Sequence, residues 1–238
     1  MSDTTEPHAR TVGLAVLSQM RRDILNGTLA PGSQLRFEAL RLAYGTSFST
    51  CREALSYLVG EGLVRAESQR GFKVIRLTRP DLYDLYDSWI VVERAAIAQA
   101  LPRGDSAWEA KLRLILARYK SDAAQGEVAP WLVQLQAQQA SLDAIAAPCA
   151  SPTMEFLRRR LAIRSLHYWQ AGRHFGVEPP RRAHDFKGLL QAALRQNIAA
   201  TADRVEAILR ADVAAFDAHA DALWQMPEQA RPRTDKRS

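Results

Sequence analysis

The strongest constraint on the fold is the order of helix-length segments and glycine breaks near the start of the chain. Apolar side chains recur at helical spacing over residues 14–25, and a glycine stands just past their end. A Pro-Gly turn follows, and a second, shorter helix is predicted over residues 37–43 with Leu40 and Leu42 directed inward. Gly45 then breaks the pattern. These breaks predict short helices joined by tight turns.

A third helix is predicted to open at Ser49 and to stop at Gly60. Thr50 and Glu53 have the spacing of a capping box, in which a hydroxyl and a carboxylate satisfy free amides of the first turn. The apolar positions of this helix form one stripe: Cys51, Ala54, Leu55, Leu58 and Val59. Because Cys51 lies in that stripe, it is expected to be a core residue rather than a redox sensor.

Two short strands, over residues 63–66 and 72–76, are predicted after the third helix, around a turn that ends in Gly71. Three helices followed by two strands outline a winged helix-turn-helix. Such a fold suits DNA, because a helix fits the major groove and its first amides attract phosphate. The predicted DNA-contacting residues are Arg36, Ser47, Phe48, Ser49, Thr50, Arg52, Arg70, Gly71 and Lys73.

The positive charge of the chain lies mainly at its two ends. The net charge is +6, of which residues 1–77 hold +3, from ten Lys/Arg against seven Asp/Glu. Residues 78–225 hold 18 against 17, and the tail from residue 226 holds four against two. This distribution favours a polyanionic partner for the N-terminal segment.

Three stretches stand in order within residues 14–77: "ILNGTLAPGSQL", "LRLAYGTSFSTCREALSYLVGEGLV" and "RGFKV". Together they resemble the signature of GntR-type regulators, and the resemblance covers residues 14–77. Arg52-Glu53-Ala54-Leu55 and Arg70-Gly71 match that pattern closely. Two positions depart from it: Phe48 stands in place of a usual DNA-contacting Arg, and Thr50 in place of the usual Pro. A Phe at this position either contacts a thymine methyl or packs against the sugar backbone.

Residues 78–225 show helical periodicity throughout, so the second region is predicted to be an all-α antiparallel bundle. Thr78 and Asp81 are predicted to cap its first helix. The remaining breaks predict helices over residues 80–101, 105–125, 129–147, 152–172, 181–196 and 199–225. The predicted organisation is therefore mostly α, with a flexible segment 1–11, a winged helix-turn-helix 12–77, the bundle 78–225 and a disordered basic tail 226–238.

A winged helix followed by six antiparallel helices resembles the FCD subgroup of GntR regulators, in which the bundle usually holds a divalent metal that grips a carboxylate effector. The metal-ligand positions of that subgroup are occupied here by Gln138, Leu142, Phe186 and Ile208, and Trp89 replaces a usual ligand-binding Arg. Leu, Phe and Ile have no lone pair to offer a metal. We therefore predict no metal and no cofactor.

Two interpretations of this former metal site stay open. In the first, its apolar side chains fill the space and pack as core, as aromatic residues inside a bundle commonly do. In the second, the site accepts an apolar or carboxylate small-molecule effector. The residues of this candidate effector pocket are Trp89, Gln138, Leu142, Arg164, His167, Phe186 and Ile208, with Tyr168 nearby. The packed-core interpretation is slightly favoured.

No catalytic motif is present: the chain has no phosphate-binding glycine loop, no HExxH, no CxxC and no GxSxG. An enzyme is not expected. The two cysteines, Cys51 and Cys149, cannot build a disulfide scaffold, and neither a secretory signal nor a membrane-spanning run occurs, which predicts a cytoplasmic protein without a membrane partner.

The resemblance thus implies a homodimeric regulator that binds a double-stranded operator, and among members of this family it implies a repressor more readily than an activator. The alternative is a ligand-independent regulator or a protein-interaction module, with a filled pocket and weakened DNA binding.

Overall fold

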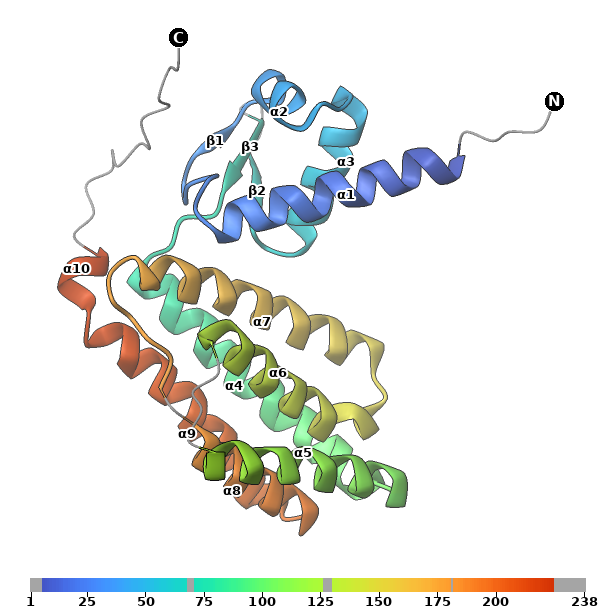
Figure 1. The fold of residues 1–238 in the computed structure, drawn as a ribbon, viewed down its shortest axis with the longest axis vertical. Helices are drawn as coiled ribbons and strands as arrows, with labels where there is room; N and C mark the ends of the chain where they lie inside the picture. Colours follow the sequence, from blue (N-terminus) through green and yellow to red (C-terminus); the bar gives the residue numbers. More distant parts are fainter. Residues whose placement is uncertain (1–5, 68–70, 126–129, 181, 225–238) are drawn as a thin grey trace. The chain divides into compact units, whose positions relative to one another are not determined.

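The computed structural model describes residues 6–67, 71–125, 130–180 and 182–224, and these are mainly helical (Figure 1). The tail that was predicted to be disordered, residues 226–238, lies outside the described residues. The elements of the N-terminal region are α1 (Glu6–Leu25), β1 (Gln34–Leu35), α2 (Phe37–Tyr44), α3 (Phe48–Gly60), β2 (Val64–Glu67) and β3 (Gly71–Val74). Helix α1 begins at Glu6, within the segment for which flexibility was expected up to residue 11.

The wing is a three-stranded antiparallel sheet in the order β1-β3-β2, where only two strands were predicted. Strand β1 pairs Leu35 with Phe72, and β2 pairs Val64 with Val74. The additional strand was missed because two residues are too few to show an alternating pattern. Side chains of these four residues share one face of the sheet, since neighbours along a strand alternate.

A continuous apolar core joins α1, α2, α3 and the sheet. Its buried members are Val16, Leu17, Met20, Ile24, Leu35, Leu40, Cys51, Ala54, Leu55, Leu58, Leu63, Val64 and Val74. Burial of each large side chain contributes roughly 1.5–3 kcal/mol. Arg21 donates to Glu61, which caps the end of α3, and so ties α1 to the last turn of α3.

In helix α2, Leu42 lies on the exposed side, although it was predicted to face inward. Leu40 is buried, but Leu42 is 83% exposed. The reason is geometric: two residues are about 200° apart around a helix, so a helix of two turns cannot direct both toward the same neighbour. Gly45 ends α2 with a φ of 57°, a left-handed conformation that favours glycine.

In the second region, every secondary-structure element of the described residues is helical, as predicted. They are α4 (Arg79–Ala100), α5 (Ser106–Gln125), α6 (Trp131–Ala146), α7 (Pro152–Arg173), α8 (Ala183–Leu194), α9 (Ile198–Asp217) and α10 (Ala220–Trp224), with 3-10 turns η1 (Leu101–Arg103) and η2 (Ala147–Cys149). Thr78 Oγ1 accepts from the Asp81 amide at 3.3 Å, so the predicted cap of α4 is confirmed.

Polar pairs along α4 and α9 show that these two helices run antiparallel. As the chain advances along α4, the partners move backward along α9: Tyr83 with Asp217, Asp87 with Arg210, and Arg94 with Asp203. The single helix predicted over residues 199–225 is in fact two helices. It breaks at residues 218–219, where the backbone tightens and His219 N donates to Phe216 O at 3.1 Å.

The described residues cluster into two compact units. One contains α1 to β3, the chain up to Asp81, the C-terminal part of α7 (residues 163–175) and the chain from Asp221. The other contains residues 82–162 and 176–220. Among the helices described, none is long and apolar enough to cross a membrane.

Candidate nucleic-acid interface

The first turn of α3 presents a cluster of hydroxyl groups. Ser47 is the N-cap, and its Oγ accepts from the Thr50 amide at 3.1 Å. The same oxygen lies 2.8 Å from Ser49 Oγ and 2.9 Å from Thr50 Oγ1. The helix therefore begins one residue earlier than predicted, and Ser47 caps it instead of Thr50. Ser47, Phe48 and Ser49 are exposed, so this turn offers donors and amides to a ligand.

The rest of α3 divides into a buried and an exposed side. Cys51, Ala54, Leu55 and Leu58 are buried as predicted, while Val59 is half-buried. Burial raises the pKa of the Cys51 thiol, which disfavours the reactive thiolate and supports its place in the core. Arg52 is exposed on the opposite side. Helix α3 thus holds Arg52 outward on a rigid element.

The outer face of the wing carries basic side chains in register. Lys73 of β3 stands directly opposite Gln34 on one neighbouring strand and opposite Arg65 on the other. The like charges of Lys73 and Arg65 repel each other across the strands. Glu67 weakens this repulsion by accepting a hydrogen bond from Arg65 at 2.9 Å. A phosphate beside Lys73 would weaken the repulsion further.

Of the three remaining residues that were predicted to contact DNA, the structure describes Gly71 and Arg36. Gly71 opens β3 with a φ of 84°, a conformation that favours glycine. Arg70 lies outside the described residues. Arg36 precedes α2 and is exposed.

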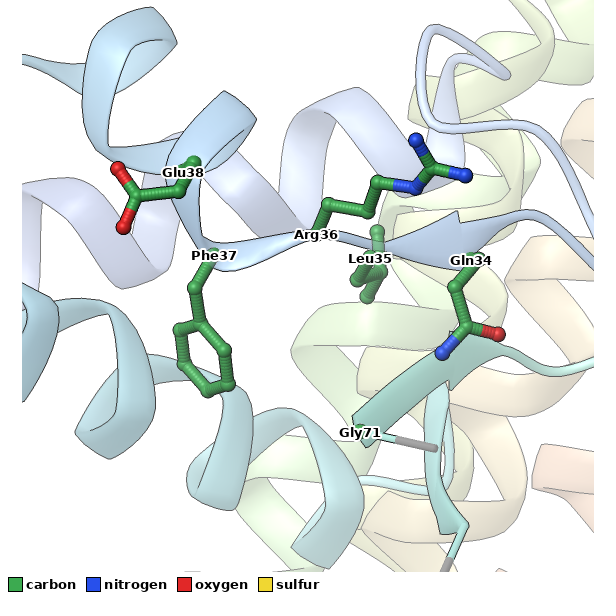
Figure 2. Close-up of a pocket in the computed structure, with 6 residues that line it drawn as sticks. All are labelled: Gln34, Leu35, Arg36, Phe37, Glu38 and Gly71. Carbon is green, nitrogen blue, oxygen red and sulfur yellow. The ribbon is translucent and has the colours of Figure 1, made fainter. Parts of the chain in front are cut away.

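An open hollow lies where β1 runs into α2. It has a volume of about 560 Å³ and is lined by Gln34, Leu35, Arg36, Phe37, Glu38 and Gly71. Figure 2 shows Phe37 projecting to the side away from Arg36 and Glu38. Two oppositely charged side chains, those of Arg36 and Glu38, are among the residues that line this hollow.

Three phenylalanine rings link the start of α3 to the wing, and the sequence patterns did not single out two of them. The centroids of Phe37 and Phe48 are 4.3 Å apart, with the rings tilted by 33°. Phe37 also meets Phe72 of β3 edge to face, at 5.8 Å and 87°. The three rings lie on α2, α3 and β3, so these contacts leave no local sequence signal.

Four bundle positions were assigned to metal ligands only through the resemblance to the FCD subgroup, and their side chains do not suit a metal. Leu142, Phe186 and Ile208 are buried and offer no lone pair, and Gln138 is only partly buried. The ring of Tyr119 stacks on Phe186, with centroids 5.8 Å apart. Within the part of the chain that the structure describes, no group of three or more His, Cys, Asp or Glu residues is placed to hold a metal.

The predicted effector-pocket residues divide between the two compact units. One unit contains Arg164 and His167, together with Tyr168, and the other contains Trp89, Gln138 and the three apolar positions. Arg164 and Tyr168 both donate to Asp81, and Tyr168 Oη also donates to the Thr78 carbonyl at 3.1 Å. This network joins α7 to the first turn of α4. His167 is buried beside it, and burial lowers its pKa to about 4.

Two buried ion pairs in the bundle went unnoticed at the level of sequence. Glu93 pairs with Arg158 at 3.0 Å, and Asp212 with Arg182 at 2.8 Å. Burial raises the pKa of Asp212 to about 6, although Arg182 opposes the change. Each partner comes from a different helix or connection, so neither pair leaves a local sequence signal.

Comparisons with known proteins agree with this architecture. The family model for "Bacterial regulatory proteins, gntR family" matches residues 13–74. The HTH-type transcriptional repressor GlaR of Escherichia coli (strain K12) is 31% identical over 182 residues, which are 74% of this chain and 81% of GlaR. The uncharacterized HTH-type transcriptional regulator BphR of Paraburkholderia xenovorans (strain LB400) is 40% identical over 105 residues, but the match spans only 43% of BphR.

A solved structure, that of E. coli McbR/YncC, has the same fold with a TM-score of 0.63. The sequences are 20% identical, and the match covers 87% of this chain and 98% of the other. The winged helix with its helical second region defines a helix-turn-helix transcriptional regulator. The chain belongs to the gntR family of bacterial regulatory proteins.

Proposed function

We propose that this regulator is a homodimeric repressor of the FCD subgroup, which binds a near-palindromic operator through the first turn of α3 in each copy. Two winged helices related by twofold symmetry read half-sites about one helical turn, roughly 34–36 Å, apart. A repressor needs only to block the promoter, whereas an activator needs a further contact surface. The relative GlaR is named a repressor, which supports this choice.

The observation that carries the proposal is the exposed first turn of α3. Its amides, the hydroxyls of Ser47 and Ser49, and the Arg52 guanidinium lie within two turns of one rigid helix. Amides and hydroxyls suit phosphate oxygens, and an arginine suits the paired acceptors of guanine. Lys73 supplies a further cation on the wing. Together these groups provide both positioning contacts and a base contact.

Control by an effector has weaker support than DNA binding. Trp89, Leu142, Phe186 and Ile208 are each at most 5% exposed. Such burial favours the interpretation in which apolar side chains fill the former metal site. We therefore favour repression that does not depend on a ligand at these positions. Retention of a small apolar or carboxylate compound by the purified protein would reverse that preference.

The decisive experiment selects bound sequences from a random DNA pool and measures the affinity of the enriched site at several salt concentrations. We expect a near-palindrome, binding as a dimer by light scattering, and a logarithmic salt slope of about −0.9 for each phosphate contacted. Enrichment of no sequence, with no affinity at low salt, would favour the protein-interaction module instead. Transcription from a promoter carrying the site is expected to fall when the protein is added.

A further inference from the structure

Phe48 is an exposed aromatic residue in the first turn of α3, the turn that is proposed above to bind DNA. It is the first residue of the helix and is 47% exposed, whereas the nearby exposed residues Ser47, Ser49 and Arg52 are polar. An exposed ring forgoes part of the roughly 1.5–3 kcal/mol that full burial of a large apolar side chain contributes. The first turn of α3 thus carries an apolar contact group among polar ones.

The ring of Phe48 is held in place rather than free. It packs on Phe37 at 4.3 Å, and Phe37 packs edge to face on Phe72. Phe37 and Phe72 are partly buried against the apolar core of the winged helix. Aromatic pairs of this kind favour a defined geometry, so Phe48 presents its open side from a fixed position. A fixed contact group discriminates between ligands better than a mobile one.

The chemistry of the major groove limits what such a ring recognises. Base edges there present hydrogen-bond donors and acceptors, and thymine alone adds an apolar group, its 5-methyl. A phenylalanine ring has no donor or acceptor to offer. We propose that Phe48 contacts a thymine methyl group in each half-site and determines specificity at that base pair. This inference rests on the operator binding proposed above.

The test replaces each thymine of the selected operator in turn by uracil, which removes only the methyl group. For the wild-type protein we expect one position in each half-site where uracil weakens binding about fourfold, the equivalent of ~0.8 kcal/mol for one buried methyl. Phe48→Ala is expected to bind the thymine and uracil operators equally. Tyr57→Ala is the matched control: Tyr57 is an exposed ring of the same helix, about half a turn around from Phe48, and its loss should leave the discrimination intact.

Phe48→Arg keeps the test decisive if Phe48→Ala does not fold, because a long aliphatic stem still packs on Phe37. Repeating the selection with this variant is expected to change the preferred base at the same position from thymine to guanine. Specific binding by the wild type without sensitivity to any uracil would overturn this inference and leave the proposed function standing. Absence of specific binding by the wild type would overturn both.

Discussion

Arg158 Nε donates to the Glu93 carboxylate at 3.0 Å, and both side chains are buried within the helices of the second region. The indole of Trp89 donates to the same carboxylate oxygen, also at 3.0 Å. Burial raises the pKa of Glu93, while Arg158 and Trp89 oppose that change by stabilising the charged form. Helices α4 and α7 are therefore joined by a charge pair that water does not reach.

Removal of one partner from this pair is expected to destabilise the protein strongly. Arg158→Met leaves a buried carboxylate with only Trp89 as donor, and such changes cost about 3–5 kcal/mol. The measurement is the free energy of unfolding in urea, followed by circular dichroism. Glu93→Gln/Arg158→Met should recover most of the loss, because no buried charge remains.

Arg113→Ala is the matched control for Arg158→Met. Arg113 also pairs with a glutamate, Glu109 at 3.2 Å, but its side chain is 64% exposed. Exposed pairs of this kind contribute under about 1 kcal/mol. Equal losses in Arg113→Ala and Arg158→Met would contradict the role given to burial.

Substitutions at the start of α3 distinguish the observed cap from the predicted one. Ser47→Ala is expected to cost about 1 kcal/mol of stability, because the Thr50 amide loses its acceptor. Thr50→Ala should cost less than about 0.5 kcal/mol, as is usual for surface positions that do not cap a helix. Chemical denaturation measures both, and the reverse ranking would support Thr50 as the cap.

Arg52→Ala is expected to weaken specific DNA binding with little effect on stability. Loss of a bidentate base contact costs about 1–3 kcal/mol, which corresponds to roughly fivefold to 150-fold in affinity. Fluorescence anisotropy with the selected operator measures the change. Arg113→Ala removes the same charge from an exposed position on α5 and should bind like the wild type. Unchanged specific binding by Arg52→Ala would show that α3 does not read the operator as proposed.

His167 is expected to make the protein less stable in mild acid. Burial, with Arg164 nearby, lowers its pKa from 6.5 to about 4, while Asp81 opposes the shift. The unfolded chain therefore binds a proton more readily than the folded protein does. The contribution of His167 to stability is fully present above pH 6.5 and falls as the pH drops toward 4, by up to about 3 kcal/mol.

The pH dependence is measured as the difference between the wild type and His167→Gln in urea unfolding from pH 7 to pH 4. A difference is needed because Asp212, with a pKa raised to about 6, acts in the opposite direction over an overlapping range. The wild type should lose more stability on acidification than His167→Gln. His174→Gln, at an exposed histidine, should follow the wild type. Parallel curves for all three proteins would exclude this role for His167.

Local sequence signals predicted the elements of the winged helix well where those elements are longer than a few residues. The glycine breaks, such as Gly45 with its positive φ, act through the backbone itself and need no distant partner. The buried stripe of α3 followed from helical spacing alone. Strand β1 did not, because two residues become a strand only through their pairing with β3.

The sequence named the residues of the candidate interface but not the contacts among them. Ser47, Phe48 and Arg52 were named because the first turn of a recognition helix commonly contacts DNA, and their role in binding DNA stays a prediction. Which hydroxyl caps the helix depends on where its first turn closes, and neighbouring serines and threonines at residues 47, 49 and 50 compete for that role.

By itself, the sequence determined the order of the helices, the glycine-bounded winged helix and the apolar character of residues 142, 186 and 208, because each depends on local spacing or side-chain chemistry. Tertiary structure alone decided that Phe37 supports Phe48 and that Glu93 meets Arg158, which lies 65 residues away. Contacts of this kind form only when whole elements pack together, and the residue pattern of one segment does not indicate which distant segment packs against it.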